Sequence, residues 1–283
     1  LPVELGVRVE SVERDGSGYL VTAGDRQFAA DDVVVAMATY QVPKVPDFAD
    51  ELGDGVVQLH SADYRNPDQL QDGGVLVVGA GNSGAEIALE LADGHETWLS
   101  GRDVGHVPFH VDSWFGRHVG VPFVMRVLFH RILTTGTPIG RRMRPKALTE
   151  GIQLVRTKPR DLDEAGVERV PRTTGVRDGR PVVGDDGVLD VSNVVWGTGF
   201  EPAFSGIARA RMGGERLEEH VDGAAVVVRL APGLYFVGLF FLHALTSSLF
   251  TGVGRDAAYV VDHLASRDRS VRRPHSTGDP VTT

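Results

Sequence analysis

No cysteine occurs among the 283 residues of the chain. This absence excludes disulfides, thiolate metal sites, and every enzyme mechanism that depends on a catalytic thiol or a redox-active cysteine pair. No segment provides the roughly 18 uninterrupted apolar residues that indicate a membrane-spanning helix. The N-terminus also lacks the basic region and apolar run of a signal peptide. We therefore expect a cytoplasmic protein without a transmembrane segment.

Basic residues are also outnumbered by acidic ones. The chain has 29 lysines and arginines against 38 acidic residues, which gives a formal net charge of −9. This balance argues against a general nucleic-acid binder. Glycine, by contrast, is abundant, with 35 residues and no collagen-like period. Together with 42% apolar residues, this composition is typical of a globular fold with many tight strand-to-helix turns.

The clearest pattern lies in residues 75–93. Its first four residues, Val75–Val78, are all apolar, which predicts a parallel strand buried on both faces. Glycines follow, and from Ala85 onward apolar residues recur at helical spacing. A glycine motif of the form G-x-G-x-x-G between such a strand and such a helix predicts a dinucleotide site.

The three glycines of this motif have separate expected roles. Gly79 permits the tight turn, Gly81 lets a pyrophosphate approach the backbone, and Gly84 lets the helix pack against the strand. The backbone N–H groups at the helix start would then face the anion. The predicted cofactor-binding residues of the turn are Gly79, Ala80, Gly81, Asn82, Ser83 and Gly84, with Asn82 and Ser83 holding the nicotinamide end or the phosphates. The alternative is a glycine turn that binds nothing.

The residues after the next expected strand indicate which nucleotide binds. Residues 96–100 predict that strand, and Arg102 lies 18 positions beyond Gly84, about where the ribose-reading residue belongs. A guanidinium suits a 2′-phosphate, so NADPH is favoured over NADH, with Ser100 and Arg102 as binding residues. In the alternative interpretation, Arg102 is a solvated surface charge beside Asp103.

Further elements follow from simpler patterns. Alternating residues and glycine turns predict a β-meander over residues 7–23, and residues 32–36 predict a buried parallel strand. Strands are also expected within residues 188–200 and 233–238, and a helix over residues 257–265.

Three motifs together resemble the flavin-containing monooxygenase family, especially its bacterial members and the plant YUCCA-type enzymes. They are His60-Ser-Ala-Asp-Tyr64, Gly79-Ala-Gly-Asn-Ser-Gly84 and Trp196-Gly-Thr-Gly-Phe200. The resemblance implies an α/β fold with two Rossmann-like dinucleotide-binding domains, in which an NADPH domain is inserted into an FAD domain. It also implies cofactor-related roles for the matching residues His60, Ser61, Tyr64, Gly197, Thr198 and Gly199. Arg255 and Asp256 are added because a helix that starts this way in two-nucleotide flavoproteins points toward the flavin.

The same resemblance implies an activity. It is that of an FAD- and NADPH-dependent monooxygenase, which oxygenates a small organic substrate with O₂ through a flavin peroxide. In such an enzyme the cofactors carry the chemistry and the protein orients them. No catalytic acid, base or nucleophile is therefore predicted.

The expected domain layout follows the family. Residues 1–46 form a remnant of the FAD domain, 47–182 the NADPH domain with a basic helical cap, 183–265 the return of the FAD domain, and 266–283 a disordered tail. The family's first strand, glycine turn and helix for FAD have no counterpart in these residues. We therefore expect a fragment of a longer protein, in which NADPH has a full site and FAD an incomplete one.

Residues 104–160 differ in composition from the rest of the chain. They contain ten lysines and arginines against two acidic residues, and Arg126 and His130 share one helical stripe among apolar neighbours. Three interpretations remain open: a cap lining the substrate entry, a helix in weak peripheral contact with anionic lipid, and an ordinary subdomain with a solvated basic rim.

Other enzyme classes and a metal site find less support. Tyr40 and Lys44 match the Tyr-x-x-x-Lys pair of short-chain dehydrogenases, but Pro43 forbids the helix on which that pair works. Thioredoxin-reductase-like chemistry needs two cysteines. No metal site is expected at His106, His110, His118 and His130, because Pro108 disrupts helical spacing. A non-catalytic NADPH-binding protein remains the alternative to the monooxygenase.

Overall fold

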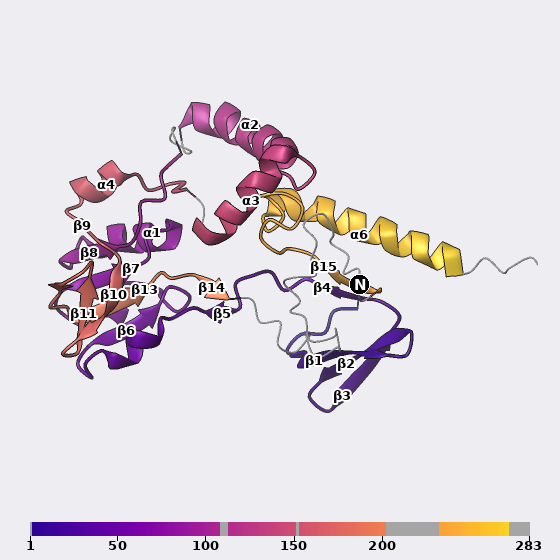
Figure 1. Cartoon of the computed structure of the whole chain (residues 1–283), viewed down its shortest axis with the longest axis horizontal. Helices are drawn as coiled ribbons and strands as arrows, with labels where there is room; N and C mark the ends of the chain where they lie inside the picture. Colours follow the sequence, from indigo (N-terminus) through magenta and orange to yellow (C-terminus); the bar gives the residue numbers. More distant parts are fainter. Residues whose placement is uncertain (1, 108–112, 151–152, 202–231, 272–283) are drawn as a thin grey trace, which may run out of the picture. The chain divides into compact units, whose positions relative to one another are not determined.

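The computed structural model describes residues 2–107, 113–150, 153–201 and 232–271. Its contacts divide the chain into two compact units. Unit 1 comprises Leu1–Ala38, Phe129–Arg141 and Ala203–Thr283, and unit 2 comprises Thr39–Leu128 and Arg142–Pro202. Both units combine parallel strands with helices, so the expected α/β fold class is confirmed (Figure 1).

A five-stranded parallel sheet forms the centre of unit 2. Its order is β6 (Val57–His60), β13 (Asn193–Trp196), β7 (Val75–Val78), β8 (Thr97–Ser100) and β9 (Glu168–Val170). All four residues of β7 and of β13 are buried, as central strands covered on both faces require. The predicted strands at residues 75–78 and 96–100 are thereby confirmed.

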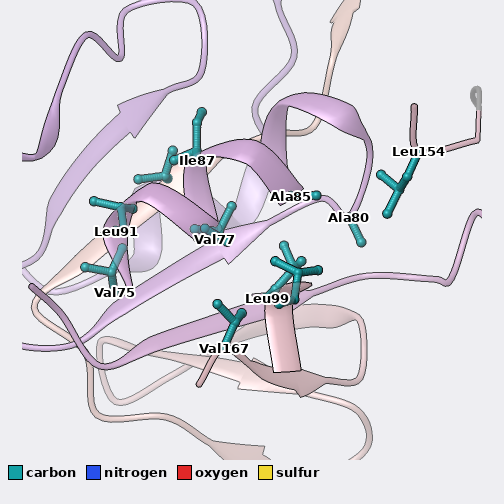
Figure 2. Packing of buried hydrophobic residues seen from close by; sticks show 12 residues of the cluster. Val75, Val77, Ala80, Ala85, Ile87, Leu91, Leu99, Leu154 and Val167 are labelled. Atoms are coloured by element: carbon teal, nitrogen blue, oxygen red, sulfur yellow. The ribbon is translucent and has the colours of Figure 1, made fainter. Parts of the chain in front are cut away.

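Helix α1 (Asn82–Leu91) covers one face of this sheet. Val77, Leu91 and Leu99 are fully buried in the apolar cluster between helix and strands (Figure 2). The opposite face packs around Trp196 with residues from the 3₁₀-helix η1 (Asp47–Glu51). The predicted strand–glycine turn–helix unit is therefore present, and packing on both faces fixes its position.

Unit 2 also contains smaller elements. They are the 3₁₀-helix η2 (Pro67–Gln69), helix α4 (Pro159–Glu164), the antiparallel strands β10 (Thr173–Arg177), β11 (Arg180–Val183) and β12 (Gly187–Val188), and the antiparallel pair β5 (Val42–Pro43) and β14 (Phe200–Glu201). Because Tyr40–Lys44 runs into β5 and forms no helix, the Tyr-x-x-x-Lys match has no dehydrogenase geometry.

The position of β13 corrects one expectation. The predicted layout assigned residues from 183 onward to the FAD domain, whereas β13 is hydrogen-bonded between β6 and β7 in unit 2. The fully buried Asn193 anchors it, since Asn193 Oδ1 accepts from Gln71 N at 3.0 Å and Asn193 Nδ2 donates to Gln71 O at 2.9 Å. Apolar residues predicted a buried strand correctly, but they do not specify which strands lie beside it.

Unit 1 contains the predicted meander and a parallel strand pair. The meander is β1 (Ser11–Asp15), β2 (Gly18–Ala23) and β3 (Arg26–Ala30), all antiparallel. Strand β4 (Val33–Val35) pairs in parallel with β15 (Leu234–Phe236), and their core includes Tyr19 and Val260. The first two meander strands and both parallel strands were expected and are confirmed, whereas residues 7–10 form no strand and β3 lies beyond the predicted range of residues 7–23.

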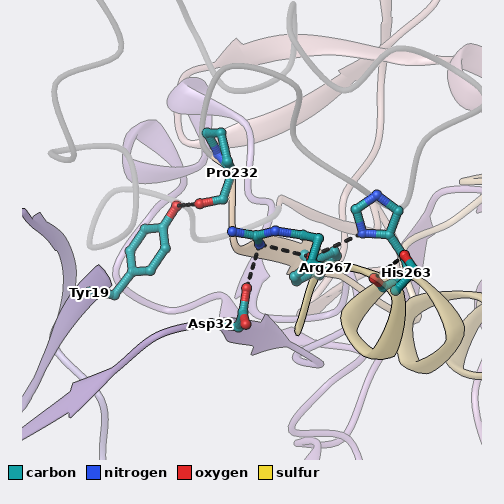
Figure 3. Close-up of polar contacts among 7 residues, drawn as sticks. Tyr19, Asp32, Pro232, His263 and Arg267 are labelled. Atoms are coloured by element: carbon teal, nitrogen blue, oxygen red, sulfur yellow. Dashed lines mark hydrogen bonds and ion pairs between the residues drawn. The ribbon is translucent and has the colours of Figure 1, made fainter. Parts of the chain in front are cut away.

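Helix α6 (Phe250–Val271) is longer than predicted. Arg267 forms an ion pair with Asp32 and donates to the hydroxyl of Tyr235 at 3.1 Å, and that hydroxyl lies 3.1 Å from His263 Nδ1 (Figure 3). These contacts hold the last turns of α6 against β4 and β15. The expectation of disorder from residue 266 is therefore wrong as far as Val271, and residues 272–283 lie outside the described ranges.

The basic segment is helical over residues 114–132 and 138–150. It contains the π-helix η3 (Gly116–Gly120), α2 (Val121–Phe123), the π-helix η4 (Val124–Ile132) and α3 (Pro138–Glu150). Within the described ranges, no helix has the length and apolarity to cross a membrane, and no three His, Asp or Glu side chains are grouped as a metal site requires. His110 lies outside the described residues.

Candidate functional site

Two glycines of the β7–α1 turn are required by close backbone contacts. Gly79 has a φ of +113°, and a Cβ there would lie 2.2 Å from the carbonyl oxygen of Gly197. A Cβ on Gly84 would lie 1.8 Å from the carbonyl oxygen of Gly79. No side chain fits at either position, so these glycines are needed for the turn to close.

Gly81 differs from both. Its φ is −80°, which other residues adopt, and nothing lies within 4 Å of the position that a Cβ would take. The fold itself therefore does not demand glycine at this position. The open space fits a ligand group that approaches the backbone closely, as a dinucleotide pyrophosphate does.

The start of α1 is suited to an anion. The first intrahelical hydrogen bond runs from Ala85 N to Gly81 O at 2.9 Å, so the N–H groups of residues 82–84 have no acceptor within the helix. Gly81 caps the helix without a side-chain hydrogen bond, and no acidic residue stands in the first turn. Free N–H groups and the positive end of the helix dipole together favour a phosphate.

Asn82 and Ser83 differ in whether their side chains are available to a ligand. Asn82 Nδ2 donates to Gln153 O at 3.1 Å, and Val155 N donates to Asn82 Oδ1 at 2.8 Å. This amide therefore fastens residues 153–155 to the helix start. Ser83 is exposed, and its hydroxyl has no hydrogen-bond partner among the described residues. Of the two, Ser83 is the one whose side chain is available to a ligand.

The end of β8 lies directly beside the glycine turn. Gly101, with a φ of +142°, passes so close to Ala80 that a Cβ there would be 2.8 Å from Ala80 N. Arg102 is exposed and has no hydrogen bond or ion pair with any described residue. Ser100 is fully buried, and its Oγ donates to Pro171 O and accepts from Thr173 N. Arg102 is thus accessible to a nucleotide, whereas the Ser100 side chain is not.

His60 joins the end of β6 to the end of β13. Its Nδ1 accepts from Ala62 N at 3.1 Å, so the proton is on Nε2, which donates to Gly199 O at 3.0 Å. Gly199 O also accepts from Lys44 N at 3.0 Å, and the ring of Phe200 packs edge-on against His60. His60 is 6% exposed, so its role is to hold the neighbouring backbone in place.

The remaining motif residues support the same region. Ser61 N donates to Trp196 O at 3.0 Å, and the hydroxyl of Tyr64 donates to Glu90 Oε2 of α1 at 3.1 Å. Burial and the Glu90 carboxylate raise the pKa of Tyr64. Gly197 N donates to Val78 O at 2.7 Å, and the Thr198 hydroxyl donates to Lys44 O. These residues hold β6, β13 and α1 together around the glycine turn.

Unit 1 contains a second polar cluster, around Arg255 and Asp256 on α6. Arg255 Nη1 donates to His130 O at 2.9 Å, and its Nε lies 3.8 Å from Asp256 Oδ1. Arg255 Nε and Nη2, Asp256 Oδ2 and Thr135 Oγ1 are buried without a hydrogen-bond partner among the described residues. Buried polar atoms normally have partners, so this cluster fits the polar edge of a bound group.

Sequence reasoning missed most of this cluster. His130 Nδ1 lies 3.1 Å from Thr246 Oγ1, and Thr135 N donates to His243 O at 2.8 Å. Burial, followed by the nearby Arg255 guanidinium, lowers the pKa of His130 and of His243. The only sequence signal was a group of polar residues inside the apolar run of residues 239–250.

The chain is similar to several known proteins. Residues 1–104 match the family model described as pyridine nucleotide-disulphide oxidoreductase. An oxidoreductase of Geobacillus kaustophilus, named CzcO-like, is 33% identical over 93% of this chain and 73% of its own length. Bacillus subtilis CzcO is 28% identical, with coverage of 93% and 74%. A shorter stretch, 21% of this chain and 14% of its relative, is 39% identical to the rice indole-3-pyruvate monooxygenase YUCCA1.

Solved structures agree with the fold. A variant of the flavin monooxygenase from Stenotrophomonas maltophilia superposes with a TM-score of 0.69 at 24% identity, covering 94% of this chain and 72% of that one. The structure of OTEMO in complex with FAD and NADP gives a TM-score of 0.59 at 12% identity, covering 93% and 66%. The chain thus shares the two-domain Rossmann-like fold of these flavoproteins. The 33% identity with the Geobacillus kaustophilus protein, over 73% of its length, places the chain in the family of CzcO-like oxidoreductases.

Proposed function

We propose that the protein is an NADPH-dependent flavoprotein monooxygenase that oxygenates a small organic substrate with O₂. NADPH binds at the turn between β7 and α1, and FAD is held in part by unit 1. The observation that carries the proposal is Gly81, whose missing side chain serves no packing purpose and leaves open space at the start of α1. The FAD and NADP in the structure of OTEMO support the same pair of cofactors in this protein.

The chain's own residues bind and position NADPH. The free N–H groups at the start of α1 receive the pyrophosphate, and the exposed Arg102 receives the 2′-phosphate. His60 supports this site through its hydrogen bond to the carbonyl of Gly199, and Tyr64 supports it through its hydrogen bond to Glu90 on α1. When bound, the flavin supplies the oxygen-transfer chemistry, for which side chains provide no substitute.

Arg255 and Asp256 are the residues through which unit 1 contributes to the flavin. Their partnerless buried atoms offer two N–H donors and one carboxylate acceptor. An isoalloxazine edge carries both acceptors and a donor, so the two sets are chemically complementary. Within the described residues, unit 1 offers no second glycine turn between a buried strand and a helix, so none of them is assigned to the FAD pyrophosphate.

Titration of NADPH against a glycine variant tests the proposal. Gly81→Val places a side chain where the pyrophosphate must lie, and we expect at least a hundredfold loss of affinity in a folded protein. Gly94→Val is the matched control, since Gly94 also has nothing within 4 Å of its Cβ position but lies at the far end of α1. Equal NADPH affinity in both variants would show that the turn is not the nucleotide site.

Oxygen-dependent consumption of NADPH after addition of FAD then separates an oxidoreductase from a protein that only binds the nucleotide. In protein whose visible absorbance shows bound FAD, we expect consumption by the wild type and none by Gly81→Val. NADPH binding without any consumption would favour the non-catalytic alternative.

A further inference from the structure

A second arginine lies beside Arg102. Arg169 is the middle residue of β9, and its partner in the parallel register with β8 is Leu99. Leu99 packs among the residues that face α1, and residues paired in register point to the same face of a sheet. The Arg169 guanidinium therefore extends over the α1 face, and its Nη2 donates to Gly101 O at 3.2 Å. That carbonyl belongs to the peptide bond between Gly101 and Arg102.

The position of β9 beside β8 is well fixed. On the opposite face of the sheet, Trp98 Nε1 donates to Glu168 Oε2 at 3.0 Å. Immediately after β9, Ser100 Oγ donates to Pro171 O at 2.9 Å and accepts from Thr173 N at 2.8 Å. These contacts lie on both sides of Arg169 along the chain. They fix the backbone at Arg169 and do not involve its guanidinium.

Neither guanidinium is neutralised by a carboxylate of the described residues. Among these residues, Arg169 has only its hydrogen bond to Gly101, and Arg102 has none. The adjacent acids are engaged elsewhere, because Asp103 Oδ1 accepts from Gly105 N at 2.7 Å and Glu168 accepts from Trp98. Because Arg169 reaches the peptide bond from which Arg102 extends, we expect one anion to contact both guanidiniums.

We propose that Arg169 is a second specificity-determining residue for NADPH, which shares the 2′-phosphate with Arg102. The inference rests on the proposed nucleotide site. One N–H of Arg169 is used by Gly101 O, which leaves its other donors for a phosphate dianion. A phosphomonoester has three strongly accepting oxygens, enough for two guanidiniums at once. The 2′-hydroxyl of NADH offers no charge to either of them.

The test compares two small nucleotides that differ only in this phosphate. Dissociation constants for 2′,5′-ADP and 5′-AMP are measured by calorimetry for the wild type, Arg169→Gln, Arg169→Lys and Arg180→Gln. Arg180 is exposed on β11 and serves as the control for the same loss of charge elsewhere in unit 2. We expect Arg169→Gln to weaken 2′,5′-ADP by about tenfold or more and to leave 5′-AMP unchanged. Arg169→Lys should recover part of the loss, and Arg180→Gln should have no effect.

The outcomes separate this inference from the function on which it rests. If the wild type binds both nucleotides equally, the NADPH assignment fails and the role of Arg169 fails with it. If the wild type prefers 2′,5′-ADP but Arg169→Gln keeps that preference, only the role of Arg169 is overturned. A parallel loss of both nucleotides in Arg169→Gln would also overturn it, since that result indicates a structural role.

Discussion

At the scale of single residues, the three glycines of the nucleotide turn obey different constraints. Gly79 and Gly84 are fixed by backbone atoms within 2.2 Å of their Cβ positions, whereas Gly81 faces open space. The first two would be required in any protein with this turn. Gly81 is the one of the three that packing does not require, and the open space beside it at the helix start fits a nucleotide, which is why it carries the functional assignment.

Arg102 provides the first prediction at this scale. Its exposed guanidinium should make charge-assisted hydrogen bonds to the 2′-phosphate. Arg102→Ala should therefore cost about 1.5–3 kcal/mol, or roughly tenfold to a hundredfold in NADPH affinity, with little change for NADH. Fluorescence titration with both nucleotides measures this. Equal weakening of NADPH and NADH would contradict the assignment.

At the scale of elements, Asn82 links the start of α1 to a segment 71 or more residues away. Its amide uses a donor and an acceptor on the backbone of Gln153 and Val155. In turn, Leu154 N donates to Gly105 O, and Val107 N donates to Leu154 O. The two ends of the basic segment are thus joined to each other and to the nucleotide turn.

We predict that Asn82→Ala releases residues 153–155. The Val155 amide loses its acceptor, so its hydrogen exchange should accelerate by about tenfold, because a net hydrogen bond of about 1–1.5 kcal/mol is removed. Asn82→Asp should keep the acceptor for Val155 N but lose the donor to Gln153 O, and should give an intermediate rate. Unchanged exchange at Val155 in Asn82→Ala would show that other contacts hold this segment.

The helix α6 and the turn around His243 lead to a prediction about pH. Burial and then Arg255 lower the pKa of both His130 and His243, and Asp256 opposes this effect. The unfolded chain therefore binds these protons more readily than the folded chain. Stability should be fully present above the ordinary histidine pKa of about 6.5 and should be lost as the pH falls below it.

Urea denaturation between pH 5 and 8 tests this prediction. The double variant His130→Gln, His243→Gln should depend less on pH than the wild type over this range. His95→Gln is the control, because His95 lies in unit 2 and its hydrogen bond to Gly73 O is exposed to solvent. A wild-type protein that becomes more stable toward pH 5 would contradict the effect expected from burial and Arg255.

The same elements show how far the sequence alone could predict the structure. The β7–α1 unit was readable because its apolar period changes across a glycine turn. The neighbours of β13 were not, since four buried apolar residues fit any central position in a parallel sheet. The contact of Arg169 with Gly101 was also hidden, because it depends on the register between β8 and β9. Likewise, His130 and Thr246 are 116 residues apart in sequence.

At the scale of the whole molecule, the net charge and the groups near the nucleotide have opposite effects on binding. The chain carries a net charge of −9, which by itself would repel an anionic dinucleotide. Charges on distant surfaces are largely screened beyond about 8 Å at physiological ionic strength. In the proposed complex, Arg102, Arg169 and the free N–H groups of α1 act within that distance of the nucleotide. The attraction of the nucleotide to these nearby groups therefore outweighs the repulsion expected from the net charge.

Hydrogen exchange with and without NADPH most directly tests the central claim, that NADPH binds at the start of α1. At a saturating concentration established by titration, peptides covering residues 79–91 and 97–102 should exchange more slowly, because the nucleotide accepts from the free N–H groups of residues 82–84. Peptides from the meander at residues 11–30 should not change. Unaltered exchange over residues 79–84, with protection elsewhere in the chain, would contradict the account.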